Sequence, residues 1–255
     1  MAEWYRNNAE GTGPAVVYLY GRIGQDWFGD GNASKEFAQE LDALSPRDID
    51  LRVNSEGGDV FEGYAIYSAL NRYPGRVTAY VDGLAASAAS FLIMASNEIV
   101  MGEASYLMIH DAWALVAGNA EELREIAQRL DSIDSQMADI YSRRASKSDE
   151  DIREAMAAET WFTAQEAVEW GLADRIDESL KAAACISRDA AKLFGSVPDG
   201  IDIDDQPLIA DTQEVEGTRQ EPGLEDDGQE PAAALKAVAL SSGRVVYLIR
   251  ERKDE

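Results

Sequence analysis

The hydrophobic positions in the first two-thirds of the chain follow two periods, which alternate along the sequence. Short runs rich in β-branched and aromatic residues predict strands over residues 16–23, 48–53, 76–81, 98–101 and 106–110. Apolar residues spaced three or four positions apart predict helices over residues 34–44, 59–73, 87–96, 121–146, 149–158 and 164–170. Strands that alternate with helices predict an α/β layered fold whose strands pair mostly in parallel.

The longest predicted helix, residues 121–146, carries a stripe of apolar residues on one face. The stripe consists of Leu123, Ile126, Leu130, Ile133, Met137 and Ile140. A stripe of this kind is usually core packing, and a helix this long and amphipathic also suits a subunit interface.

The composition changes after about Ala191. Residues 199–230 contain many Asp and Glu, several Gly and Pro, and one basic residue, Arg219. That composition predicts a disordered acidic linker. Apolar residues return between Ala232 and Arg250. This segment has two alternative interpretations, a short docking element or an edge strand. We therefore expect a main domain over residues 1–195, a linker over 196–231 and a short C-terminal segment over 232–255.

The 255-residue chain carries a formal net charge of −25, from 48 acidic and 23 basic residues. Such a surface repels phosphate backbones, so we expect no nucleic-acid partner and no anionic membrane partner. The N-terminus is polar and lacks a secretory signal. The most apolar run, residues 83–96, is shorter than the roughly 18–20 residues that a membrane span needs. We expect a soluble protein of the cytoplasm.

The chain contains one cysteine, Cys185, and one histidine, His110. A single cysteine cannot form a disulfide within the chain, and one His with one Cys makes a zinc cage very unfavourable. We expect neither a metal site nor an organic cofactor.

Ser87 lies where a predicted strand and turn enter an apolar helix of small residues. A hydroxyl at a helix N-terminus sits among unpaired backbone N–H groups, which favour a developing negative charge. Position alone indicates an N-cap more strongly than a nucleophile. His110 ends an apolar strand 23 residues later and would supply a base, although a histidine at a strand end is more often a packing residue.

Gly57 and Gly58 follow another predicted strand. Two glycines there let the backbone approach a ligand closely and direct N–H groups into a cleft. A tight turn between strand and helix is the plainer interpretation, and both can hold together.

Four segments resemble the ClpP family of serine peptidases in order and spacing, from about Val16 to Asp177. They are Asn54-Ser-Glu-Gly-Gly58, Gly83-Leu-Ala-Ala-Ser87-Ala-Ala, Ser105-Tyr-Leu-Met-Ile-His110 and Phe162-Thr-Ala-Gln-Glu-Ala-Val-Glu-Trp-Gly171-Leu-Ala-Asp174.

The resemblance implies a ClpP/crotonase-like fold and endopeptidase activity on protein or peptide substrates. It implies Ser87 as nucleophile and His110 as general base, with Gly57 beside the substrate and the N–H groups of Gly58 and Ala88 as the oxyanion hole. It also implies a projecting handle helix over residues 121–146, through which subunits associate into homo-oligomeric rings.

Two positions depart from the family pattern. Glu56 stands where the family usually has Pro, and Thr160 stands where it has the aspartate of the triad. As a third member, Thr160 would orient His110 without offsetting the imidazolium charge. Glu159 and Asp174 are substitutes, although Glu159 points away if Thr160 points in. Asp111 is unfavourable, because neighbours on a strand face opposite ways. We therefore predict slow turnover, or turnover that depends on assembly.

The Thr-Trp-Phe-Thr segment at 160–163, the acidic linker and the C-terminal piece resemble the ClpP-related head maturation proteases of tailed phages and prophages. That resemblance implies capsid or scaffold proteins as substrates, inside an assembling prohead or in the host cytoplasm. Three alternatives stay open. They are a proteolytic subunit of an ATP-dependent Clp protease with an ATPase partner, a crotonase-type acyl-CoA enzyme, and a non-catalytic ring-forming assembly protein.

Overall fold

The computed structural model describes residues 7–8, 13–25, 31–32, 34–180, 184–203, 236–239 and 245–248. The chain divides into two compact units, Met1–Ile209 and Ala210–Glu255. The first unit contains every candidate site residue named above.

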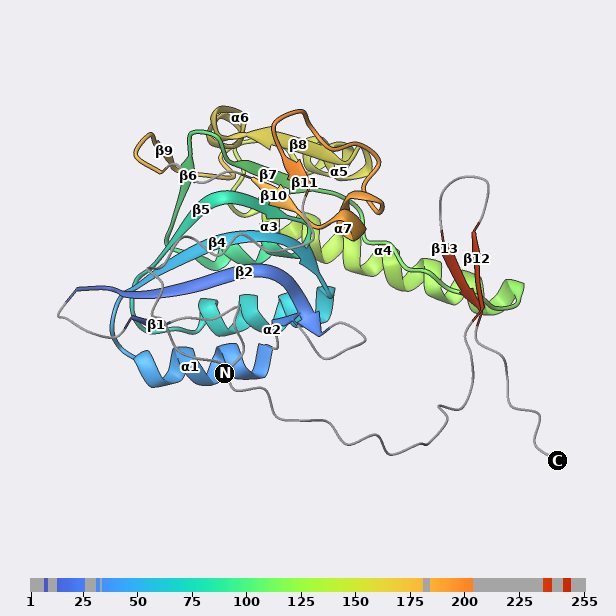
Figure 1. Ribbon diagram of the computed structural model, residues 1–255, viewed down its shortest axis with the longest axis horizontal. Helices are drawn as coiled ribbons and strands as arrows, with labels where there is room; N and C mark the ends of the chain where they lie inside the picture. The colour runs from blue at the N-terminus through green and yellow to red at the C-terminus, as the bar shows by residue number, and fades with distance from the viewer. Residues whose placement is uncertain are drawn as a thin grey trace, which may run out of the picture. The chain divides into compact units, whose positions relative to one another are not determined.

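A parallel sheet forms the centre of the first unit (Figure 1). Its parallel path runs β2 (Ala15–Gln25), β4 (Ile49–Gly58), β5 (Val77–Ala86), β6 (Glu98–Gly102) and β9 (Arg175–Asp177). Two short strands, β1 (Asn7–Asn8) and β3 (Gly31–Asn32), pair antiparallel with β2. β7 (Tyr106–Ile109) pairs in parallel with the end of β5 and antiparallel with β8 (Thr160–Thr163). The predicted α/β fold with mostly parallel pairing is confirmed.

The helices also follow the predicted pattern, with small shifts at their ends. They are α1 (Ser34–Leu44), α2 (Val60–Asn71), α3 (Ala88–Leu92), α4 (Ala120–Ser142), α5 (Asp149–Ala157) and α6 (Ala164–Glu169). The predicted helix over residues 87–96 ends early and continues as the 3-10 turn η1 (Ile93–Ala95), and the short helix α7 (Arg188–Ala191) was not predicted. Asp59 caps α2 and Ser148 caps α5, because each side chain accepts backbone N–H groups of the first turn. None of the helices in the described ranges is both long enough and apolar enough to cross a membrane.

The burial of alternate residues explains which face of each strand meets the core. In β4, Ile49, Leu51 and Val53 are buried while the residues between them are half-exposed. Nearly all of β5 is buried, because both of its faces are covered. The main core lies against α1, α2 and α3. A second cluster forms around Leu84, Ala86, Met108, Ala184, Ile186 and Ile201.

The apolar stripe of α4 packs on this chain's core only in its second half. Ile133, Met137 and Ile140 are buried, whereas Leu123 is 42 % exposed. Core packing therefore accounts for the second half of the stripe, and a subunit interface stays a prediction for the first half. Leu123 faces outward, whereas Ile126 and Leu130 are half-buried.

The main domain continues past residue 195. β10 (Cys185–Ile186) pairs in parallel with β11 (Asp202–Ile203), and Ile201 is buried in the second cluster. Most of the predicted acidic linker lies outside the described residues. In the second unit, β12 (Lys236–Ala239) and β13 (Val245–Leu248) form an antiparallel hairpin.

Candidate active site

Ser87 sits in a strained turn between β5 and α3. Its backbone has φ 54° and ψ −123°, a conformation that costs a non-glycine residue of order 1–3 kcal/mol. It occupies the N-cap position of α3, yet its side chain makes no capping hydrogen bond. The N-cap interpretation of this serine is therefore wrong. The turn leaves the hydroxyl available to another group, as in the sharp strand-to-helix turns that present nucleophilic serines.

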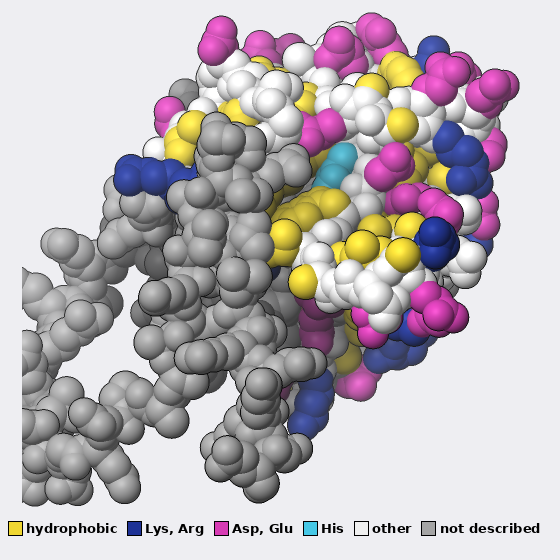
Figure 2. Space-filling view, turned by 90° about the vertical axis from the view of Figure 1, so that its right-hand side faces the viewer, with side chains coloured by type: hydrophobic (Ala, Val, Ile, Leu, Met, Phe, Trp, Pro, Cys, Tyr) yellow, Lys and Arg dark blue, Asp and Glu magenta, His cyan; other side chains and the backbone are white. Residues whose placement is uncertain are grey.

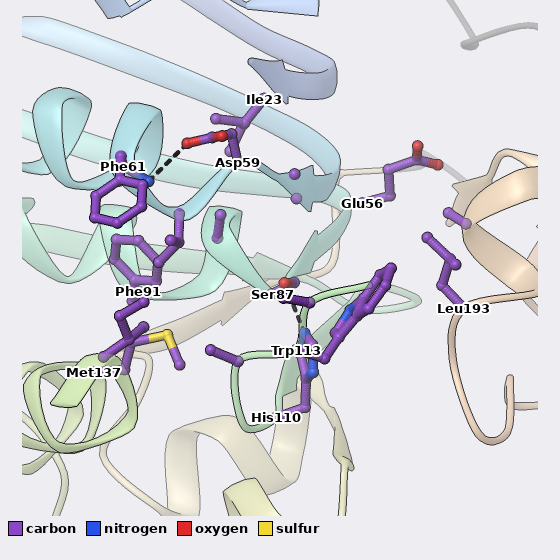
Figure 3. Close-up of a pocket in the computed structure, with 18 of the residues that line it drawn as sticks. Ile23, Glu56, Asp59, Phe61, Ser87, Phe91, His110, Trp113, Met137 and Leu193 are labelled. Carbon is purple, nitrogen blue, oxygen red and sulfur yellow. Dashed lines mark hydrogen bonds between the residues drawn. The ribbon is translucent and has the colours of Figure 1, made fainter. Parts of the chain in front are cut away.

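That group is His110. Its Nε2 lies 2.7 Å from the Ser87 Oγ (Figure 3). The register of the sheet explains the contact, since Ala86 of β5 is paired with Met108 of β7. The Ser87 N–H also donates to the Met108 carbonyl at 3.0 Å, which fixes the two strand ends together. A serine and a histidine at this distance have the geometry of a nucleophile and its base.

The surroundings of His110 favour its neutral form. Burial lowers the pKa of the imidazole below 6.5. The negative charges of Glu159 and Asp111, and a hydrogen bond with the Asp111 backbone, act in the opposite direction. Because burial is the largest effect, the ring is neutral near pH 7 and can accept a proton from Ser87.

Gly57 and Gly58 lie against the nucleophile and the neighbouring strand. A Cβ on Gly57 would stand 2.7 Å from the Ser87 Cβ and 2.8 Å from the Ala88 nitrogen. A Cβ on Gly58 would stand 2.0 Å from the Ile23 carbonyl oxygen. Both glycines also have positive φ, +88° and +150°. Only glycine therefore lets this part of the chain approach Ser87 so closely.

Hydrogen bonds within the protein use the N–H groups on either side of Gly58. The Gly57 N–H donates to the Ser55 hydroxyl at 3.2 Å, and the Asp59 N–H donates to the Ile23 carbonyl at 2.9 Å. Gly57 thus contributes close approach rather than a donor. The N–H groups of Gly58 and Ala88 stay the predicted oxyanion donors.

Thr160 does not reach His110, which corrects the prediction of a threonine as third member. Its hydroxyl donates to the Ala155 carbonyl at 2.7 Å. Thr160 is paired across the β7–β8 ladder with Ile109, whose side chain belongs to the main core. Cross-strand partners share one face of a sheet, so Thr160 faces the core side and not the histidine.

Neither of the two carboxylates considered as substitutes for the triad aspartate, Asp174 and Glu159, is hydrogen-bonded to His110. Asp174 accepts the Ile99 N–H at 2.7 Å and forms an ion pair with Arg144, which places it at another edge of the sheet. Glu159 acts on His110 through its charge, while its oxygens accept the N–H groups of Gly195 and Ser196. Between described residues, no hydrogen bond joins His110 to a carboxylate oxygen.

Ser87 and His110 open into a cleft of about 490 Å³. In Figure 2 the imidazole lies in a recess bordered by apolar side chains. Figure 3 shows Phe91 and Met137 on one side of the pair and Leu193 on the other. The residues beyond 187 that line the cleft are Ala190, Leu193 and Phe194. Sequence reasoning did not predict them; the adjacent Leu193 and Phe194, at the border of a predicted linker, were the available signal.

A chain of hydroxyl groups supports the turn at Ser87 from behind. The Ser90 hydroxyl donates to the Ser87 carbonyl at 2.6 Å, and Tyr141 of α4 contacts the same Ser90 oxygen at 2.7 Å. Tyr141 and Ser90 are fully or almost fully buried. The long helix therefore helps to hold the strained turn.

Over the described part of the chain, no three His, Cys, Asp or Glu side chains form a group that could hold a metal ion. The chemistry that the site residues themselves offer is proton transfer and nucleophilic attack.

Comparisons with known proteins show which family the chain resembles in sequence. The model of a family described as Clp protease matches residues 30–179. The chain is 34% identical over 143 residues to "ATP-dependent Clp protease proteolytic subunit 2" of Corynebacterium diphtheriae. The matched region covers 54% of this chain and 71% of that protein. The chain is also 34% identical over 145 residues to "ATP-dependent Clp protease proteolytic subunit 1" of Corynebacterium jeikeium, covering 55% and 77%.

Proposed function

The chain belongs to the Clp protease family and is a ClpP-like serine-type peptidase, a hydrolase, and we propose that it cuts internal peptide bonds through an acyl-enzyme formed on Ser87. One observation carries the proposal. Ser87 is held at φ 54° with no capping bond, and its hydroxyl oxygen lies 2.7 Å from His110 Nε2. A structural serine has no need of that strained turn.

The reaction follows from these two side chains. His110 Nε2 takes the proton of the Ser87 hydroxyl as Oγ attacks the peptide carbonyl carbon, and the carbonyl oxygen becomes an oxyanion facing the Gly58 and Ala88 N–H groups. His110 then gives the proton to the leaving amine, and the C–N bond breaks. Water attacks the remaining ester by the same route, which releases the acid and restores Ser87.

The proposed third component is the Asp111 backbone together with the charge of Glu159. The backbone hydrogen bond fixes the ring, and both carboxylates favour the imidazolium that forms during attack. A carboxylate bonded directly to the ring would stabilise that cation more strongly. We therefore propose turnover slower than that of a complete Ser-His-Asp triad.

Labelling with a fluorophosphonate probe tests the proposal, because the probe reacts only with an activated serine. We expect wild-type protein to be labelled and Ser87→Ala and His110→Ala to remain unlabelled. A matched control is Ser132→Ala, at an exposed serine of α4 whose hydroxyl bonds the Gln128 carbonyl. Absence of wild-type labelling in folded, assembled protein would favour the non-catalytic assembly alternative.

We propose that the active form is a homo-oligomeric ring. Leu115, Val116 and Leu123 are 60%, 43% and 42% exposed, in and just before α4. Exposed apolar side chains gathered along one projecting element are typical of a protein interface. Size-exclusion chromatography with light scattering tests this, and a monomer at micromolar concentration would contradict it.

The comparisons favour a proteolytic subunit that works with a Clp ATPase over a head maturation protease, since the matched relatives carry the former name. The capsid-processing alternative rests on the Thr-Trp-Phe-Thr segment and the C-terminal extension. A degradation assay distinguishes these two alternatives. Degradation of a folded, tagged protein that requires ATP and a Clp ATPase supports the first, and cleavage of a coexpressed capsid or scaffold protein without ATP supports the second.

A further inference from the structure

Residues 187–196 border the active-site cleft, although they lie beyond the part of the chain that matches the family model, residues 30–179. This segment consists of Ser187, α7 and the turn that follows. Figure 3 shows Leu193 across the cleft from Phe91 and Met137, with the catalytic pair between the two sides. The segment thus forms one side of the cleft.

Two carboxylates fasten the ends of this segment. Glu56 accepts both the Ser187 N–H at 2.7 Å and the Ser187 hydroxyl at 2.9 Å. Glu159 accepts the Gly195 N–H at 2.8 Å and the Ser196 N–H at 3.2 Å. Charge-assisted hydrogen bonds of this kind are about twice as strong as neutral ones.

Both carboxylates belong to the site itself. Glu56 directly precedes Gly57, and Glu159 occupies a left-handed turn, φ 52°, close enough to His110 for its charge to act on the ring. The two attachments therefore couple the segment to the glycine loop on one side and to the histidine on the other.

Between these attachments, Phe194 packs against the histidine. Its ring centroid lies 6.0 Å from that of His110, at an interplanar angle of 77°, and 5.5 Å from that of Trp161, at 85°. Edge-to-face packing at such distances is a favourable arrangement of aromatic rings. Phe194 thus covers one side of the imidazole and restricts its rotation.

We propose that Phe194 is a positioning residue of the peptidase, and that Glu56 and Glu159 hold it so that His110 stays in line with Ser87 and shielded from water. In a Ser-His-Asp triad the ring is oriented by a carboxylate hydrogen bond, and His110 has none within the described residues. Packing by Phe194 would help to orient the ring in place of that hydrogen bond. This inference rests on the serine-peptidase function proposed above.

The charged groups around His110 determine the direction in which its pKa is expected to change. Glu159 and Asp111 favour the imidazolium, burial opposes it, and Arg22, Glu56 and Asp59 line the same cleft. Removing Phe194 exposes the ring to water and leaves the carboxylates nearby. The pKa of His110 is then expected to rise toward 6.5.

The chain has a single histidine, so NMR of protein labelled with ¹³C-histidine reads this pKa from one signal and requires no turnover. For Phe194→Ala we expect the titration midpoint to rise and kcat on a peptide substrate to fall about 10- to 100-fold, the range for a misplaced catalytic group. Phe194→Leu should recover most of both, because an apolar side chain still covers the ring.

Leu193→Ala is the matched control, since Leu193 lies in the same segment, lines the cleft and is 46% exposed. It should leave the His110 midpoint unchanged and alter KM. Ser187→Ala should shift the midpoint in the same direction as Phe194→Ala, because it removes one of the two hydrogen bonds that hold the segment to Glu56 and leaves every charge in the cleft in place. This second variant keeps the test valid if Phe194→Ala fails to fold.

An unchanged midpoint and kcat in both Phe194→Ala and Ser187→Ala would overturn the proposal. An equal shift in Leu193→Ala would also overturn it, because the effect would then belong to the segment as a whole and not to Phe194. If the wild-type protein does not hydrolyse peptides, the proposed function fails, and the NMR midpoint still reports whether Phe194 shields His110.

Discussion

Tyr141 of α4 holds Ser90 of α3 through a hydrogen bond of 2.7 Å between their hydroxyl oxygens. Because the Ser90 hydroxyl donates to the Ser87 carbonyl, Tyr141 must be the donor to Ser90. The long helix is therefore connected to the backbone of the nucleophile by two consecutive hydrogen bonds. The position of α4, which also carries the exposed Leu123, is thus linked to the shape of the active site.

The first prediction concerns this connection. Tyr141→Phe removes one buried hydrogen bond and should lower the free energy of unfolding by about 1 kcal/mol, and the rate of fluorophosphonate labelling should fall with it. Urea unfolding measures the first effect and time-resolved labelling the second. Tyr67→Phe is the control, since no hydrogen bond of the Tyr67 hydroxyl occurs within the described structure. Equal effects in both variants would contradict the prediction.

The second prediction concerns close approach at the glycine loop. Gly57→Ala should abolish labelling, because its Cβ would stand 2.6 Å from the Ala86 carbonyl oxygen and 2.7 Å from the Ser87 Cβ, at a φ of +88°. Gly13→Ala is the matched control, since a Cβ there meets no atom within 4 Å. Normal labelling of Gly57→Ala would show that the loop does not confine the nucleophile.

The third prediction is a pH dependence. Burial lowers the pKa of His110, and only the neutral ring accepts the Ser87 proton. The labelling rate should therefore fall as the pH is lowered, with its midpoint below 6.5. The rate of probe hydrolysis in buffer, measured at each pH, is the control. A midpoint above 6.5 would mean that the carboxylates Glu159 and Asp111 outweigh burial.

The fourth prediction tests the correction at Thr160. Thr160→Asp restores the residue type that the family has at this position. We nevertheless expect the variant to increase neither the rate of labelling nor the rate of turnover. The hydroxyl donates to the Ala155 carbonyl, and a carboxylate would instead repel that oxygen, so stability should fall by about 1–3 kcal/mol. Thermal unfolding and labelling measure the two effects. Faster labelling than wild type would show that this side chain does reach His110.

The fifth prediction concerns a buried carboxylate in the sheet. Asp82 is 1% exposed and accepts hydrogen bonds from Tyr20 and Arg52. Arg52→Ala removes the cation that compensates this charge and should lower the free energy of unfolding by about 3 kcal/mol. Arg76→Ala breaks the exposed pair with Glu98 and should cost less than about 1 kcal/mol. Similar unfolding midpoints in urea for the two variants would contradict the prediction.

The residue pattern predicted five strands of the sheet, their mostly parallel pairing and the helices α1 to α6, but not the short elements β8, β9 and α7. The periods of two and of three to four residues report which faces are buried, and burial is the main force that selects each element. The residue types at Gly57, Gly58, Ser87 and His110 also marked the site, because only glycine tolerates that close approach and only histidine offers a base near neutral pH.

Which side chains surround His110 depends on how segments distant in the chain pack together. Register places Thr160 opposite Ile109 and turns it toward the core, and it separates Asp174 from the site. The contact of Phe194 with His110 joins residues 84 positions apart in the chain. It depends on hydrogen bonds that Glu56 and Glu159 accept from Ser187 and Gly195, which no local pattern encodes. Local periodicity records burial, whereas the direction of a side chain across a site depends on how distant strands align.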